Sequence, residues 1–206
     1  MRKLLVTTFL TLDGVMQAPG GPEEDPSEDF AYGGWSVSYF DDDVGRAMDK
    51  VMGKPFDLVL GRKTYEIFAA FWPNAPEEAG GKPLNDATKY VASRTLSEDS
   101  LEWEKSVLIE SDVAEGVAAL KQQDGPELQV HGSCNLLQTL LSHNLIDEFH
   151  LLVFPVVVGS GKRLFADGTV PSGLKLVDSM VSTSGVMIGR YVPVGDIPIG
   201  TFALEG

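Results

Sequence analysis

Short apolar runs alternate with helix-like segments through the first 150 residues of the chain. We predict strands at 3–11, 56–60, 89–92, 106–110, 127–130 and 147–158, and helices at 41–52, 61–71, 112–123 and 135–143. Because parallel strands need crossover connections, this alternation predicts an α/β fold with a mostly parallel sheet flanked by helices. Segments 174–182 and 186–192, joined by Ser184-Gly185, predict antiparallel strands at the C-terminal edge.

The length of 206 residues fits one domain that carries a long irregular segment at 12–40. This segment contains Pro19-Gly20-Gly21-Pro22 and five acidic residues between positions 23 and 29. A loop of this length in a compact domain is usually functional. We therefore expect it to have little core of its own and to close over a substrate.

The formal net charge of −14 argues against a nucleic-acid surface and against an anionic membrane as partners. The one cysteine, Cys134, cannot form an intramolecular disulfide, and no run approaches the ~20 apolar residues of a membrane span. We expect a cytoplasmic protein. Three dispersed histidines give no metal-ligand spacing, so no metal is expected.

Three junctions that follow predicted strands carry small or polar residues. They are Gly61-Arg62-Lys63-Thr64, Ser93-Arg94-Thr95 and Gly132-Ser133-Cys134-Asn135. Ligands bind at the carboxyl ends of strands in open α/β sheets, helix N-termini attract phosphate, and arginine binds it through a fork. Together the junctions predict a site for a multiply phosphorylated nucleotide. The alternative for each junction is a capped helix or a turn. A Walker loop is absent, and no G-x-G-x-x-G follows the first strand.

The same segments resemble a known superfamily. Residues 60–66 (LGRKTYE) resemble the cofactor-binding strand–turn–helix of dihydrofolate reductases. Residues 10–15 (LTLDGV), and 154–161 followed by Leu164-Phe165, are similar to the C-terminal reductase domain of bifunctional riboflavin-specific deaminase/reductases. Residues 130–136 are similar to the glycine-rich turn of both groups, although His131-Gly132 stands where dihydrofolate reductases have Gly-Gly. The match covers roughly residues 3–192.

The resemblance implies a dihydrofolate-reductase-like fold and hydride transfer from NADPH. The implied substrate is pteridine-like or a ribosylamino-pyrimidine, as for a 5-amino-6-(5-phosphoribosylamino)uracil reductase. The zinc-type H-x-E with P-C-x-x-C of the deaminase is absent, so the implied protein is a free-standing reductase.

The resemblance also implies cofactor roles for individual residues. The adenosine side and the 2′-phosphate are assigned to Gly61, Arg62, Thr64, Ser93 and Arg94. The pyrophosphate is assigned to Gly132, Ser133, Cys134, Asn135 and Leu136. The nicotinamide is assigned to Thr11, Asp13, Gly14 and Met16. The start of a helix also favours a lowered pKa for Cys134.

Several candidate substrate residues have two interpretations. Asp13 either orients substrate in catalysis or bonds its own turn. Trp35 and Tyr39 either stack on a flat heterocycle or pack the long loop. Counting back from Lys54-Pro55 places Asp43 as the carboxylate that anchors the substrate, but Asp41 and Asp42 are equally suited by their chemistry. The alternative for all three is that they supply negative charge at the N-terminus of a helix.

Other functions remain open at this point. A general carbonyl or nitro reductase is one alternative, a nucleotide-binding regulatory module without turnover is another, and a structural α/β domain is a third. We expect a homodimer, because the apolar region 151–158 is longer than one central strand needs and riboflavin-type reductases pair.

Overall fold

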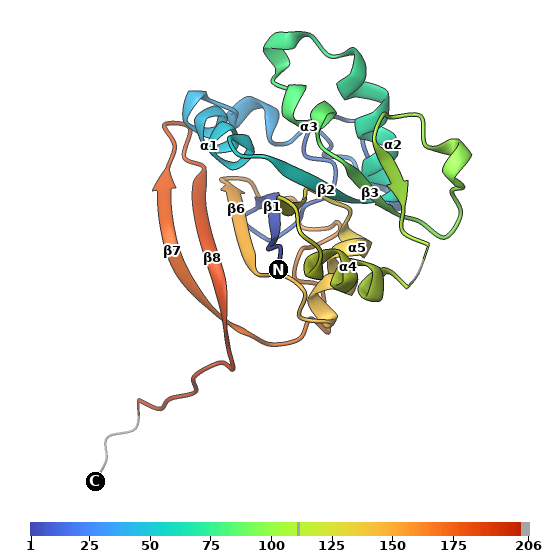
Figure 1. Cartoon of the computed structure of the whole chain (residues 1–206). Helices are drawn as coiled ribbons and strands as arrows, with labels where there is room; N and C mark the ends of the chain where they lie inside the picture. Colours follow the sequence, from blue (N-terminus) through green and yellow to red (C-terminus); the bar gives the residue numbers. More distant parts are fainter. Residues whose placement is uncertain (111, 203–206) are drawn as a thin grey trace.

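The computed structural model describes residues 1–110 and 112–202, which are built around one sheet of eight strands (Figure 1). The strand order is β4-β3-β2-β5-β1-β6-β8-β7. The strands are β1 (Leu4–Thr11), β2 (Phe56–Gly61), β3 (Lys89–Ala92), β4 (Ser106–Leu108), β5 (Glu127–Val130), β6 (Glu148–Phe154), β7 (Gly173–Val181) and β8 (Met187–Gly195). The first six are parallel, and β8 and β7 continue the sheet antiparallel. This confirms the predicted fold class.

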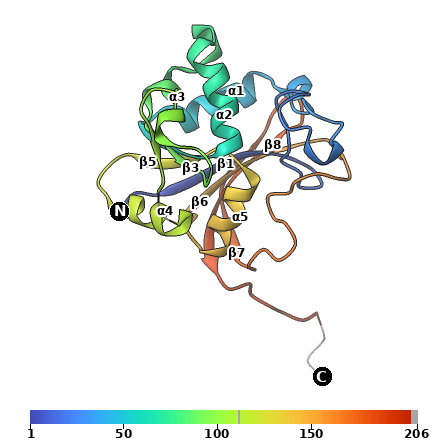
Figure 2. The same cartoon turned by 90° about the vertical axis from the view of Figure 1, so that its right-hand side faces the viewer.

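Helices cover both faces of the sheet (Figures 1 and 2). They are α1 (Asp42–Met52), α2 (Arg62–Phe71), α3 (Lys82–Asp86), α4 (Val113–Gln122) and α5 (Cys134–Ser142). The first three lie on one face, and α4 and α5 lie on the other. Two helices begin at aspartate caps, because Asp41 accepts a bond from the Val44 amide at 2.9 Å and Asp112 does the same for Ala114. No helix in the described part of the chain is both long and apolar enough to cross a bilayer.

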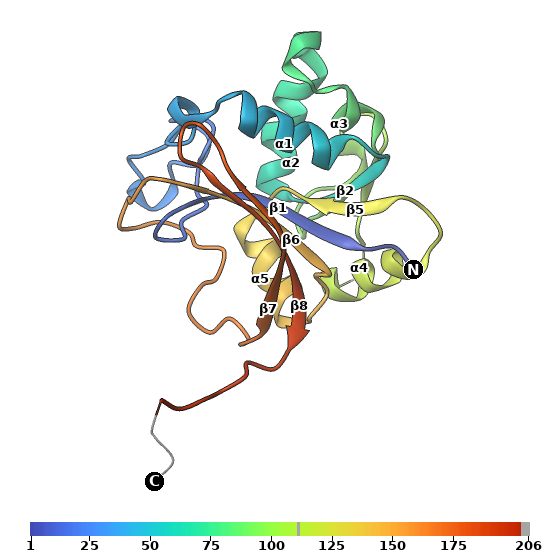
Figure 3. The ribbon, with the colours of Figure 1, turned by 90° about the vertical axis from the view of Figure 1, so that its left-hand side faces the viewer.

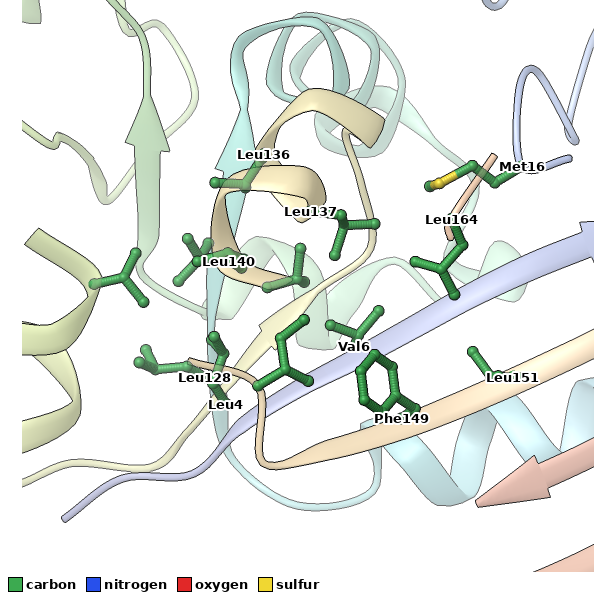
Figure 4. Close-up of a cluster of buried hydrophobic side chains, with 14 of the residues drawn as sticks. Leu4, Val6, Met16, Leu128, Leu136, Leu137, Leu140, Phe149, Leu151 and Leu164 are labelled. Carbon is green, nitrogen blue, oxygen red and sulfur yellow. The ribbon is translucent and has the colours of Figure 1, made fainter. Parts of the chain in front are cut away.

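Three apolar clusters hold these layers together. The largest joins β1, β5 and β6 to α4 and α5, and Figure 4 shows Leu137 and Leu140 of α5 above Val6 of β1. The second lies on the α1 face and contains Val44, Leu152 and Phe154. The third lies between β2 and the helices α2 and α3.

Residues 12–40 form an irregular segment, but it has more buried side chains than expected for a segment with little core of its own. Phe30 and Trp35 are 7% and 9% exposed and belong to the second apolar cluster. The Trp35 indole donates to the Gln17 carbonyl at 2.8 Å and packs edge-on against Phe154. The segment is therefore anchored by its own aromatic side chains.

The apolar run at 147–158 is shorter as a strand than expected. β6 ends at Phe154, because Pro155 follows and has no amide hydrogen to donate. Since β6 lies between β1 and β8, Leu151, Leu152 and Phe154 are buried within one chain. The β6 part of this run is therefore covered inside one chain and does not support a dimer, whereas Val157 beyond it is exposed.

An exposed apolar edge lies at β7 instead. This strand is at the end of the sheet, and Figure 3 shows the β7–β8 hairpin extending beyond the helical layers. The exposed apolar side chains of β7 are Leu174, Leu176, Val177, Met180 and Val181.

Candidate functional site

The turns after β2 and β5 are in direct contact. A Cβ added at Gly61 would lie 2.1 Å from Ser133 Oγ, and one added at Gly132 would lie 2.7 Å from Thr64 Oγ1. Both distances are shorter than real Cβ atoms show, so a larger residue at either position would force Ser133 or Thr64 to shift. The Gly132–Ser133 peptide bond is cis. The close approach brings the N-termini of α2 and α5 together at one edge of the sheet.

Neither of these helix N-termini has a side-chain cap. Gly61 and Ser133 occupy the N-cap positions of α2 and α5, and neither makes a capping bond through a side chain. Amides in the first turn of a helix have no partner within that helix. Paired in this way, the two termini offer amide donors and positive dipole ends to an anionic group.

The turn after β3 is connected to this pair through Arg62. Its Nη1 donates to Thr95 Oγ1 at 2.6 Å, and its Nε donates to Glu66 at 2.6 Å. The Ser93 hydroxyl accepts from the amide of Thr95 at 3.1 Å, which closes the turn. Arg94 is exposed, and its side chain makes no hydrogen bond or ion pair with the described residues. The three predicted junctions thus form one continuous region.

A second feature, which sequence reasoning missed, is an open edge of β1. The last pair between β1 and β5 is Val6 with Val130, whereas β1 stays paired with β6 as far as Thr11. From Thr7 onward, β1 therefore has a neighbour on one side only. No signal in the sequence reveals this, because strand register depends on residues more than a hundred positions apart.

The main chain of Phe9 points toward that open side. In a parallel ladder, successive residues direct their amides alternately to the two neighbours. The Lys3 carbonyl accepts from β5, and the Leu4 carbonyl accepts from the β6 side. Phe9 is an even number of residues from Lys3, so its amide and carbonyl point to the same side as those of Lys3. On that side, β5 no longer pairs with β1. The amide and carbonyl of Phe9 are therefore a donor and an acceptor that β5 does not pair.

Asp13 holds the loop beside this edge. Its carboxylate accepts from Thr11 Oγ1 at 2.6 Å, from the Gly159 amide at 2.8 Å and from the Val158 amide at 3.3 Å. Burial raises the pKa of Asp13, but these hydrogen bonds outweigh it and lower the pKa below its ordinary value. Asp13 therefore acts as an anchor between two loops, and its contact with substrate stays a prediction.

The other predicted nicotinamide and pyrophosphate residues divide into two groups. The side chains of Met16 and Leu136 are buried in the largest apolar cluster, as Figure 4 shows, so only their main chain can meet a ligand. Gly14 has a φ of +81° and faces open space, and Asn135 is exposed.

Burial raises the pKa of the Cys134 thiol, which corrects the expectation of a lowered value.

Packing dominates the surroundings of Trp35 and Tyr39. The ring centroids of Trp35 and Tyr39 lie 5.4 and 6.5 Å from that of Phe154, both in edge contacts. Trp35 is nearly fully buried, so its faces are occupied by protein. Tyr39 is less buried, and its stacking on substrate stays a prediction.

The structure separates the three aspartates at α1. Asp43 pairs with Arg46 at 2.5 Å and accepts from the Thr183 amide at 3.1 Å, so both its oxygens are already engaged. Asp41 caps α1 and also accepts from the Ser184 amide at 2.7 Å. Asp42 is exposed. A shallow hollow of about 370 Å³ is lined by Phe40, Asp41, Asp42, Gly45, Arg46 and Asp49. Of the three, Asp42 has the carboxylate most open to a ligand.

The histidine nearest the paired turns is neutral. Burial, together with the nearby His150, lowers the pKa of His131 to about 4. Its Nε2 lies 3.1 Å from Gln129 Oε1. Among the residues that the structure covers, no group of three or more His, Cys, Asp or Glu side chains is arranged to hold a metal ion.

Comparisons with known proteins find a matching family model and similar chains. The family model described as RibD C-terminal domain matches residues 2–188. Two uncharacterized proteins of Bacillus subtilis (strain 168) are similar to the chain. YyaP is 27% identical over 90% of this chain and 92% of its own length, and YwjB is 30% identical over 85% and 89%.

Two solved structures share the fold. A protein of Shewanella sp. PV-4 named for riboflavin biosynthesis has a TM-score of 0.65 at 20% identity, covering 93% of this chain and 98% of its own. A pyrimidine reductase-like protein of Corynebacterium diphtheriae has a TM-score of 0.64 at 14% identity, covering 95% and 93%. At these identities, the likeness shows a common fold.

Proposed function

Because the chain belongs to the RibD C-terminal domain family, we propose that it is an NADPH-dependent reductase acting on a small pteridine-like or ribosylamino-pyrimidine substrate. The family relationship itself supports a reductase of the riboflavin type. The observation that carries the finer proposal is the contact between the glycine turns after β2 and β5, with the arginine-bearing turn after β3 beside them.

The chemistry of these residues fits a phosphorylated dinucleotide. Gly61 and Gly132 let two uncapped helix N-termini approach each other, which suits a pyrophosphate. Arg94 has no partner among the described residues, and Arg62 reaches the same turn. In a chain with a net charge of −14, such local cations are needed to hold a 2′-phosphate.

NADPH would supply the hydride, and the protein would bind and orient both reactants. The open edge of β1 at Phe9 would fix the plane of the nicotinamide through main-chain bonds. Asp13 would keep the Val158-Gly159 turn in position beside it. Residues 12–40 would close over the substrate and exclude water.

Absorbance at 340 nm tests this proposal. The protein is incubated with NADPH and a panel of pteridines, ribosylamino-pyrimidines, deazaflavins and quinones. Oxidation of NADPH by a pteridine or a pyrimidine supports the proposal, and turnover of quinones alone would favour a general carbonyl or nitro reductase. Tight NADPH binding without turnover on any compound would favour a regulatory module.

A homodimer is part of the same proposal, now with a different surface. β7 is an edge strand with unpaired main-chain groups and five exposed apolar side chains. An identical edge from a second copy can cover it around a two-fold axis. We also keep the cytoplasm as the proposed compartment, since the one cysteine is a free thiol that cannot form an intramolecular disulfide.

A further inference from the structure

One carboxylate of the long loop lies between two lysines. Asp25 Oδ1 accepts from Lys63 Nζ at 2.9 Å, and Asp25 Oδ2 accepts from Lys162 Nζ at 2.5 Å. Ser27 Oγ completes the group, donating to Asp25 at 2.6 Å and accepting from Lys162 at 2.6 Å. The side chains of Asp25 and Lys162 are only 15% and 21% exposed. Neither lysine was among the residues predicted to bind the cofactor.

Both lysines belong to segments that border the paired turns. Lys63 is the second residue of α2, directly between Arg62 and Thr64. Lys162 precedes Arg163, whose carbonyl accepts from the thiol of Cys134, the first residue of α5. After burial, the charges of Lys162 and Asp25 also act on the pKa of the Cys134 thiol. The lysine–aspartate group therefore lies near the N-terminus of α5, with Arg163 making the contact to Cys134.

The carboxylate is held there as an anion. Partial burial raises the pKa of Asp25, but the bonds from Lys162, Ser27 and Lys63 outweigh it and keep the pKa well below its ordinary value. Asp25 therefore stays charged at neutral pH. It neutralises Lys63 and Lys162 close to the uncapped N-termini of α2 and α5, which suit a phosphate. A carboxylate held by two ammonium groups and a hydroxyl has the partners that a phosphate group takes.

We propose that Lys63 and Lys162 form a phosphate subsite and that Asp25 is its internal competitor. In the state described here, the carboxylate occupies the subsite. A phosphate group of a dinucleotide or of a sugar-phosphate substrate takes its place when residues 23–29 move away, while the rest of segment 12–40 closes over the reactants. The inference rests on the proposed function for the kind of ligand, but the exchange of one anion for another does not depend on turnover.

The matched test compares Asp25→Asn with Glu23→Gln. Both variants remove one negative charge from the same loop, but Glu23 is exposed and makes no contact with either lysine. Calorimetry measures binding of inorganic pyrophosphate, ADP, ribose 5-phosphate and NADPH. We expect Asp25→Asn to tighten binding by about ten-fold, because the phosphate ligand no longer competes with the Asp25 carboxylate for the two lysines. Glu23→Gln should change it less than two-fold. Equal gains in the two variants would mean a general effect of net charge and would overturn the proposal.

A second set of variants identifies the subsite itself. Lys162→Met should weaken binding of the same anions, and in the Lys162→Met background the gain from Asp25→Asn should disappear. A full gain without Lys162 would overturn the proposal. Should Asp25→Asn fail to fold, Ser27→Ala loosens the same group and should give a smaller gain in the same direction, and no gain there would count against the idea.

The ligands also separate the two sources of phosphate. A gain confined to ADP and NADPH assigns the subsite to the cofactor, and one confined to ribose 5-phosphate assigns it to the substrate. Hydrogen exchange of residues 20–31 should become faster when pyrophosphate binds, whereas slower exchange would overturn the displacement. Failure of every variant to bind NADPH would contradict the proposed function, while pyrophosphate would still test this inference.

Discussion

Arg94 carries the clearest prediction at the scale of a single residue. Its side chain is exposed on the turn after β3, which Arg62 reaches through Thr95. A hydrogen bond to a charged group contributes roughly 1.5–3 kcal/mol. We therefore expect Arg94→Ala to weaken NADPH binding by about ten-fold or more, since ~1.4 kcal/mol is ten-fold, and to leave NADH nearly unchanged.

The measurement is the ratio of the two dissociation constants by fluorescence titration, repeated at high salt, which should reduce the preference for NADPH. Lys54→Ala is the control, because Lys54 precedes β2, at the end of the strand opposite to Gly61, and is exposed. Equal losses for both cofactors would mean that Arg94 supports the fold instead of binding the 2′-phosphate.

Asp13 allows a prediction about pH. Its folded pKa lies below the ordinary value of 3.8, so its hydrogen bonds stabilise the protein above that value and are lost as the pH falls through the folded pKa. Asp13→Ala should lower the free energy of unfolding by about 2 kcal/mol at pH 7. The difference from the wild type should shrink below pH 3.8 in urea titrations. A loss that is independent of pH would show that the charge of Asp13 is unimportant.

The contact between two turns is tested at the scale of elements. Gly61→Ala would bring a methyl group against Ser133 Oγ, so we expect a loss of about 1–3 kcal/mol in stability together with weaker NADPH binding. Gly45→Ala in α1 is the control, because its methyl group would meet no atom within 4 Å. That change should gain about 0.5–1 kcal/mol from the backbone. Denaturant unfolding of both variants checks the pair, and a stable Gly61→Ala protein would refute the close approach.

Local sequence signals predicted the elements and the turns but not the long-range contacts. Gly61 and Gly132 were identifiable because each follows an apolar strand and precedes a helix. In contrast, Asp43 accepts from Thr183, which is 140 residues away, and no local pattern records that bond. The burial of Trp35 against Phe154 and the end of β5 pairing at Val6 depend equally on tertiary packing and register.

At the scale of the whole molecule, we predict a dimer that forms through β7. Light scattering at micromolar concentration should give twice the chain mass of 22.2 kDa. Val181→Lys on β7 should produce monomers, because like charges would then be brought together at a symmetric edge. Val107→Lys on β4, the opposite edge of the sheet, is the matched control and should stay dimeric. A wild-type mass near 22.2 kDa, or dissociation by Val107→Lys alone, would contradict the β7 interface.

The central position of β1 has a consequence for synthesis on the ribosome. β1 precedes both of its neighbours, β5 and β6, in the chain, and Leu4 pairs with Leu128 while Thr11 pairs with Phe154. Loop-closure entropy makes such distant pairings late events in folding. At ~5–20 residues per second, the nascent chain therefore waits on the order of ten seconds for β1's partners to appear. Until β5 has left the exit tunnel, the apolar β1 has no partner strand, and its side chains stay exposed for that time.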